Sequence, residues 1–91
     1  MGNSDACFFY VLRCADDSLY AGWCRDLDAR MRAHRSGNGS KYVRSRLPFR
    51  LAAAWLVANS SLARRKEAAF KRLKRPAKLE FLKTRRAKRR S

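Results

Sequence analysis

The chain of 91 residues contains few cysteines, one histidine and few acidic residues, and each shortage narrows the possible functions. The cysteines Cys7, Cys14 and Cys24 form no CxxC pair, and an odd number without that spacing argues against a disulfide framework and a zinc ribbon. The lone His34 cannot complete a standard zinc site. We therefore expect reduced thiols, no disulfide-linked partner and a cytoplasmic location.

Long hydrophobic runs are also missing from the chain. The apolar segment ACFFYVL spans only residues 6–12, whereas a membrane-spanning helix needs about 20 apolar residues. No basic residue precedes that segment, so it does not read as a secretory signal peptide. The sequence therefore predicts no membrane span, and it leaves the oligomeric state open.

The few acidic residues leave a strong positive charge. Lys and Arg number 23 against 7 Asp and Glu, which gives a net charge of +16. Basic residues are sparse in residues 1–24 and dense in residues 51–91. Such a surface attracts polyanions, with nucleic acid as the first candidate and an anionic membrane as the second. Neither long helical segment joins a wide, bulky apolar face to a basic face, so nucleic acid is favoured.

The hydrophobic pattern and the turn residues predict one small domain. The expected elements are strands 7–14 and 19–23, helix 26–37, strand 50–58, and helices 59–75 and 77–83. The order β-β-α-β-α-α predicts an α/β fold, a three-stranded sheet with an antiparallel N-terminal hairpin, flanked by helices. We expect an N-terminal extension over residues 1–6, a folded domain over 7–83 and a basic, disordered tail over 84–91.

Four residues of the first two strands and the first helix are candidates for chemistry, and each also has a purely structural interpretation. Tyr10 and Tyr20 are either core aromatics or two hydroxyls directed at one place. Arg30 and His34 are four residues apart, so they share one side of the predicted helix. That side is either an ordinary solvated surface or part of a site.

Glu67 is unusual because it lies in a strongly basic helical segment. It is the only acidic residue between Asp28 and Glu80. One interpretation is an ion pair with Lys71, four residues later, which stabilises a helix by a few tenths of a kcal/mol. The other is a ligand of a divalent metal, because Mg²⁺ binds one or two carboxylates, several waters and substrate phosphate oxygens.

These residues together resemble the GIY-YIG nuclease superfamily, particularly its short, stand-alone and largely uncharacterised bacterial branch. Phe8-Phe9-Tyr10 lies where the family has Gly-Ile-Tyr, and Tyr20-Ala21-Gly22 lies where it has Tyr-Ile-Gly. The helical segment DLDARMRAH and Glu67 follow in the family's order. The resemblance covers residues 7–83, and the chain departs from the family's pattern at Phe8-Phe9, Ala21 and Trp23-Cys24.

The resemblance implies a role for each candidate. Tyr10 would be the general base for the attacking water, or would hydrogen-bond the water that is. Tyr20 would position the nucleophile and the scissile phosphate, and Arg30 would bind that phosphate. His34 would assist proton transfer or orient Tyr10. Glu67 would bind one Mg²⁺ or Mn²⁺ ion, which with Arg30 would stabilise the transition-state charge.

The sequence therefore predicts a divalent-metal-dependent endonuclease that acts on single-stranded or branched DNA. The alternative is a non-catalytic basic module that binds DNA or RNA. Further nucleic-acid contacts are expected from Gly22, Arg25, Lys41, Tyr42, Arg44 and Lys71. Lys41, Tyr42 and Arg44 follow a glycine-rich segment, so they form either an ordinary solvated loop or a clamp in which Tyr42 stacks on a base.

Overall fold

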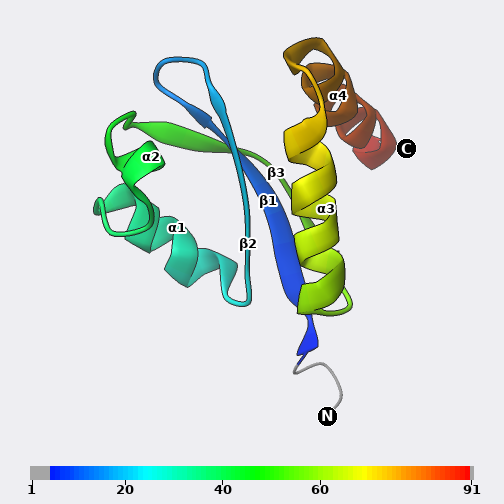
Figure 1. Ribbon diagram of the computed structural model, residues 1–91, viewed down its shortest axis with the longest axis horizontal. Coiled ribbons are helices and arrows are strands. Elements are labelled where there is room, and N and C mark those ends of the chain that lie inside the picture. The colour runs from blue at the N-terminus through cyan, green and yellow to red at the C-terminus, as the bar shows by residue number, and fades with distance from the viewer. Residues whose placement is uncertain (1–4, 91) are drawn as a thin grey trace.

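The computed structural model describes residues 5–90, and the side chains of residues 5–83. Its elements are β1 (Cys7–Cys14), β2 (Leu19–Cys24), α1 (Leu27–Arg35), α2 (Lys41–Arg44), β3 (Phe49–Val57), α3 (Ser60–Arg72) and α4 (Arg75–Arg90). The predicted α/β fold with an antiparallel N-terminal hairpin and flanking helices is confirmed (Figure 1). Within the described residues, no helix combines the length and the apolar character needed to cross a bilayer.

The sheet places β1 at its centre. The strand order is β2-β1-β3, and β1 pairs with both neighbours in antiparallel fashion. In the hairpin, Tyr10 lies opposite Gly22 and Leu12 lies opposite Tyr20. Because β1 has a neighbour on each side and helices on both faces, it is buried almost throughout, as its continuous apolar sequence predicts.

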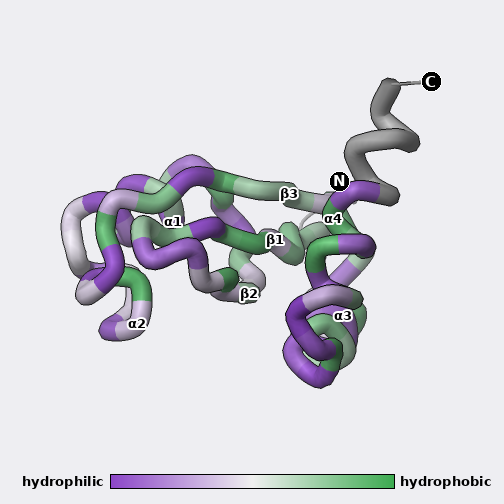
Figure 2. The backbone as a smooth tube through the Cα atoms, turned by 90° about the horizontal axis from the view of Figure 1, so that it is seen from above, coloured by the Kyte–Doolittle hydropathy of each residue, from purple (hydrophilic) through white to green (hydrophobic). Residues whose placement is uncertain are grey.

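Helices cover both faces of the sheet. Figure 2 shows α1 and α2 on one side of the strands, and α3 and α4 on the other. Successive side chains of a strand point to opposite faces, so Phe9 and Val11 face α3 and α4, whereas Tyr10 and Leu12 face α1 and α2. The two faces of β1 therefore meet different helices and have different chemistry.

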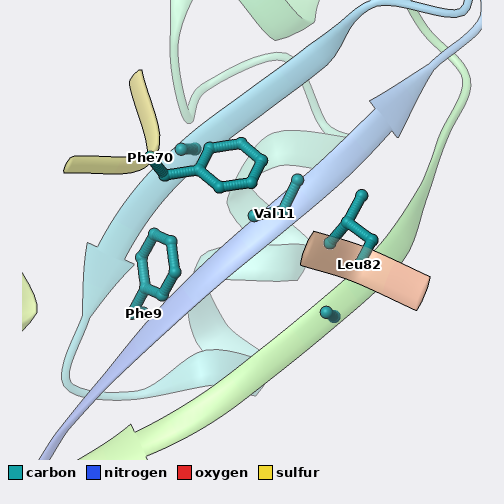
Figure 3. Packing of buried hydrophobic residues seen from close by; sticks show 6 residues of the cluster. Phe9, Val11, Phe70 and Leu82 are labelled. Carbon is teal, nitrogen blue, oxygen red and sulfur yellow. The ribbon is translucent and has the colours of Figure 1, made fainter. Parts of the chain in front are cut away.

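The face toward α3 and α4 is an apolar core (Figure 3). Phe9, Val11, Phe70 and Leu82 are all buried in it. The Phe9 ring stacks on Trp55, with centroids 5.0 Å apart, and meets the edge of Phe70 at 6.0 Å. Fully burying one such side chain contributes roughly 1.5–3 kcal/mol, so this cluster holds the C-terminal helices on the sheet.

The caps of α1 follow the sequence, whereas α2 was not predicted. Asp26 caps α1 by accepting a hydrogen bond from the Ala29 amide at 3.0 Å, and Gly37 follows the helix at φ 88°, as its position predicts. The predicted loop around Lys41 is instead the single turn α2. The Ser40 side chain caps it by accepting a hydrogen bond from the Val43 amide at 3.1 Å. A helix of one turn has too few residues to show a helical pattern in the sequence.

The last three elements differ from their predicted bounds, and β3 (Phe49–Val57) is shifted by one residue from the predicted 50–58. Asn59 caps α3, which ends at Arg72 rather than at residue 75. Helix α4 is longer than the predicted 77–83 and begins at Arg75, because Pro76 fits the first turn of a helix, where its missing amide hydrogen is not needed. α4 reaches into the segment predicted as a tail; the side chains of 84–90 and all of residue 91 lie outside the described part, and disorder there stays a prediction.

Candidate active site

A buried polar pair lies on the face of β1 that α1 covers. Tyr10 and His34 are both fully buried, and Tyr10 Oη and His34 Nε2 form a hydrogen bond of 2.9 Å. The pair joins the central strand to the last turn of α1, and their rings meet edge to face. Tyr10 is therefore both a core aromatic and a polar group, which unites the two interpretations that the sequence left open.

Burial changes the acid–base properties of both groups. Loss of solvent raises the pKa of Tyr10 well above its usual value of 10.0, and the neighbouring charge of Arg30 lowers it only in part. Loss of solvent also lowers the pKa of His34 below 6.5, and Arg30 acts in the same direction. Both groups are thus neutral near pH 7. The charge of Arg30 favours an ionised Tyr10, but desolvation of the hydroxyl outweighs it.

Two glycines leave room for this pair. A Cβ atom on Gly22 would lie 2.7 Å from Tyr10 Oη, so the Tyr10 ring occupies the space that a side chain on β2 would fill. A Cβ atom on Gly39 would lie 2.7 Å from both Cγ and Cε1 of His34. The close approach at Gly22 that the sequence assigns to substrate is made by Tyr10 itself in this structure.

Tyr20 joins the same cluster from β2. Its ring meets His34 edge to face at 5.6 Å and stacks on Tyr42 at 5.6 Å, with 27° between the ring planes. The Arg46 guanidinium lies over the Tyr42 ring, 3.8 Å from its centroid, and Arg46 Nε donates to Asp16 at 2.9 Å. Tyr42, predicted to stack on a base, therefore packs against Tyr20 and Arg46, and this arrangement holds Tyr20 in place.

Arg30 connects the buried pair to a surface pocket. The pocket has a volume of about 590 Å³ and is lined by the end of β2 and the start of α1, including Arg25 and Arg30. Both arginines are exposed, and Arg30 also lies beside Tyr10. The pocket thus offers two guanidinium groups, the donors best suited to phosphate, next to the Tyr10–His34 pair.

Glu67 lies on α3, on the opposite side of the sheet from α1 and the Tyr10–His34 pair. Its side chain is only 21% exposed, and its carboxylate forms an ion pair with Lys71 Nζ at 3.0 Å. Lys71 lines a recess together with Tyr20 and Tyr42. The predicted Glu67–Lys71 pair is thus present, and it places Glu67 one helical turn from the recess beside Tyr20.

The donor set tests whether a metal ion fits here. Among the described residues, no group of three or more His, Cys, Asp and Glu side chains could hold a metal ion. A single carboxylate beside a phosphate-binding surface suits Mg²⁺ or Mn²⁺, which retain waters and accept substrate oxygens, and does not suit zinc. Glu67 therefore fits one hard divalent cation that is bound jointly with substrate.

The other predicted contact residues lie farther along the surface. Lys41 and Arg44 are exposed on α2, on the same side of the sheet as the buried pair. Three further residues of the site were not predicted from the sequence. Gly39 leaves room for His34, Arg46 packs on Tyr42, and Lys78 lines the recess. Of these, only Gly39 has a sequence signal, its close spacing to Gly37 after the helix.

The chain is a small α/β domain in which Tyr10, His34 and Arg30 lie together, and this combination is the basis for assigning its class. The model of the family described as the GIY-YIG catalytic domain matches residues 6–80, and the chain belongs to that family. Among its relatives, the UPF0213 protein spr1390 of Streptococcus pneumoniae is 48% identical over 75 residues, which cover 82% of this chain and 76% of that protein.

Two solved structures agree with this assignment. The solution NMR structure of the UPF0213 protein BH0048 from Bacillus halodurans has a TM-score of 0.59 and 39% identity, over 87% of this chain and 84% of that one. The solution NMR structure of the protein EF2693 from E. faecalis has a TM-score of 0.65 and 37% identity, over 96% and 93% of the two chains. The predicted resemblance to the short, stand-alone bacterial branch is confirmed.

Proposed function

We propose that the protein is a divalent-metal-dependent endonuclease that hydrolyses phosphodiester bonds in single-stranded or branched DNA. The observation that supports this most strongly is the buried Tyr10–His34 hydrogen bond of 2.9 Å beside Arg30. A fold needs no such pair for stability, because a phenylalanine and an apolar residue would fill the same space without desolvating polar groups. Membership of a family of catalytic domains supports the same conclusion.

In this proposal Tyr10 and His34 act together as the base. His34 is neutral because its pKa is lowered, so Nε2 can accept the Tyr10 hydroxyl proton. Tyr10 Oη then accepts a proton from the attacking water, as the water oxygen bonds to phosphorus and the bond to the leaving oxygen breaks. Tyr10 alone cannot act as the base near pH 7, because burial raises its pKa and keeps the hydroxyl protonated.

Arg30 and Tyr20 position the phosphate. Arg30 lies beside Tyr10 and also lines the pocket with Arg25, so a phosphate bound there lies next to Oη. Tyr10 is fully buried, so this mechanism requires the exposed Arg30 side chain to move before water can reach Oη. Tyr20 is partly buried, and in this proposal its hydroxyl binds a phosphate oxygen on the other side.

Glu67 would hold one Mg²⁺ or Mn²⁺ ion. The bound ion supplies electrostatic stabilisation of the charge that develops on the phosphate oxygens. Lys71 Nζ lies 3.0 Å from the Glu67 carboxylate and offsets part of its charge.

The test is cleavage of labelled single-stranded, flap and duplex DNA with Mg²⁺ or Mn²⁺, by wild-type protein and by Glu67→Gln. We expect wild-type protein to cut single-stranded or flap DNA, and chelation of the metal to stop cleavage. Glu67→Gln should slow cleavage by about 10²–10³-fold, comparable to the loss of one electrostatic stabiliser. Glu80→Gln on α4 is the matched control and should cut at the wild-type rate.

The alternative function, a basic module that binds DNA or RNA without cutting it, is favoured by the net charge of +16 alone. It requires no buried Tyr10–His34 pair and no isolated carboxylate. If no DNA is cut under these conditions, or if Glu67→Gln and Glu80→Gln cut equally well, the nuclease proposal is wrong. Tight, salt-sensitive binding without cleavage would then support the alternative.

A further inference from the structure

A recess beside Tyr20 has the chemistry of a nucleotide-binding site. It has a volume of about 230 Å³ and lies where β2, α2, α3 and α4 meet. The residues that line it include the aromatic Tyr20, Tyr42 and Phe70 and the basic Lys71 and Lys78. Aromatic residues and two cations around one small space combine a surface for a base with phosphate binding.

The cations of the recess are held by the fold. Lys78 is half-buried, and its Nζ lies 5.6 Å from the Phe70 ring centroid, within the range of a cation–π contact. Arg75 lies three residues earlier on the same side of α4, and its Nη2 donates to Asp17 at 3.0 Å. This link to the β1–β2 turn fixes the start of α4, so Lys78 is directed into the recess.

The aromatic wall is ordered in the same way. Tyr20 and Tyr42 stack on each other, and Arg46 holds the Tyr42 ring at 3.8 Å while its Nη1 donates to the Tyr42 carbonyl oxygen at 3.1 Å. Tyr42 is thus covered by Tyr20 on one face and by Arg46 on the other, and it holds the Tyr20 ring in place. A base that enters the recess stacks on this preorganised Tyr20 ring, which loses little conformational entropy.

The recess and the arginine pocket are neighbours along β2. Residues 19–21 line the recess, residues 23–24 line the arginine pocket, and Gly22 lies between them, next to Tyr10 Oη. Consecutive residues of a strand advance by about 3.3 Å, so the two sites are separated by a few such steps. The recess is therefore within reach of a nucleotide near a phosphate that binds at Arg30.

We propose that this recess binds one unpaired nucleotide adjacent to the scissile phosphate, with its base on the aromatic wall and its phosphate at Lys71 and Lys78. The position of the scissile phosphate rests on the proposed nuclease function. A paired base is stacked on its neighbours and cannot present its face to a protein ring, whereas an unpaired base can. The recess therefore selects single-stranded or flap DNA over duplex DNA.

The experiment measures binding without cleavage. Fluorescence anisotropy, with metal chelated, compares a short labelled single-stranded oligonucleotide with a hairpin duplex at one salt concentration. Lys78→Met keeps the length of the side chain and removes its charge. It should weaken single-strand binding about tenfold or more, as expected for a lost charge-assisted hydrogen bond, with a much smaller effect on the duplex.

The matched control is Lys66→Met, because Lys66 is exposed on α3 and lines an apolar pocket away from the recess. If Lys78→Met and Lys66→Met weaken binding equally, or if single strand and duplex lose affinity equally, Lys78 adds only to the general positive field and the proposal is wrong. Circular dichroism checks that both variants fold.

A second measurement tests the aromatic wall directly. A single strand that contains 2-aminopurine should lose fluorescence on binding, because stacking on a ring quenches it, and Tyr20→Leu should restore part of the emission. An unchanged emission on wild-type binding overturns the proposal. Single-strand selectivity without any cleavage would refute the nuclease function and leave the recess as a binding site, so the two failures are distinguishable.

Discussion

The two faces of the central strand β1 show how one short segment serves both stability and chemistry. Toward α3 and α4, Phe9 packs in a wholly apolar cluster with Trp55 and Phe70. Toward α1, the next residue, Tyr10, forms a buried hydrogen bond with His34. The first face gains free energy from burial, whereas the second desolvates two polar groups and needs glycines to admit them.

This difference indicates how the fold accommodates a site. The face toward α1 and α2 also contains apolar packing, around Leu12, Met31 and Val43, but it encloses a polar pair, and His34 Nδ1 is buried without a hydrogen-bond partner among the described residues. An unsatisfied buried polar atom costs about 1–3 kcal/mol. Such a cost is typical of functional sites, where local optimisation of stability is not what the residues are selected for.

The largest expected effect is on the apolar face. Phe9→Ala removes a ring that is 1% exposed and should lower the free energy of unfolding by about 3–5 kcal/mol, because it leaves a cavity against Trp55 and Phe70. Chemical denaturation followed by circular dichroism measures this change. In a domain of this size the loss is a large fraction of total stability.

Two controls sharpen that comparison. Leu56→Ala truncates a β3 side chain that is 67% exposed and should change stability by less than about 0.5 kcal/mol. Tyr10→Phe, one residue from Phe9, keeps the ring and leaves His34 Nε2 unpaired, at a cost of about 1–3 kcal/mol. If Tyr10→Phe destabilises as much as Phe9→Ala, the two faces contribute equally and the contrast between them is mistaken.

An intermediate effect is expected at Gly39. Gly39→Ala places a methyl group against the His34 ring and should cost about 1–3 kcal/mol, as overpacking of a core does. NMR should show shifted ring signals of His34 and of its hydrogen-bond partner Tyr10. Gly37→Ala is the control: it strains a backbone at φ 88° but contacts only Arg44, so the His34 signals should not move.

The smallest effect is the pH dependence of stability that arises from the buried pair. The folded-state pKa of His34 is lowered, so the unfolded chain binds more protons below about pH 6.5 and stability falls as the pH decreases. The folded-state pKa of Tyr10 is raised, so stability is full below about pH 10 and falls as the pH rises above it.

Thermal unfolding across this pH range measures both effects. Tyr10→Phe should remove the alkaline decrease, because phenylalanine has no ionisable group, and should leave the acidic decrease in place. An alkaline decrease that is unchanged in Tyr10→Phe would show that other groups cause it, and the buried pair would then make no measurable contribution.

Most of the local structure could be predicted from the sequence, because it depends on near neighbours. Apolar runs define β1 and β3, Asp26 and Asn59 cap their helices through short-range hydrogen bonds, and Gly37 follows α1 with a positive φ. The spacing of Tyr10, Tyr20 and Arg30 indicated the family before any contact was known. Such patterns depend only on residue type and separation along the chain.

What the tertiary structure decided is which distant groups share an environment. Burial of Tyr10 against His34 raises the pKa of the tyrosine, because desolvation outweighs the nearby charge of Arg30. Tyr42 turns from an expected base contact into a support for Tyr20. Gly39 and Lys78 acquire roles only when loops and helices far apart in sequence meet at one place. Solvent exclusion and steric overlap depend on the whole fold, so no local pattern encodes them.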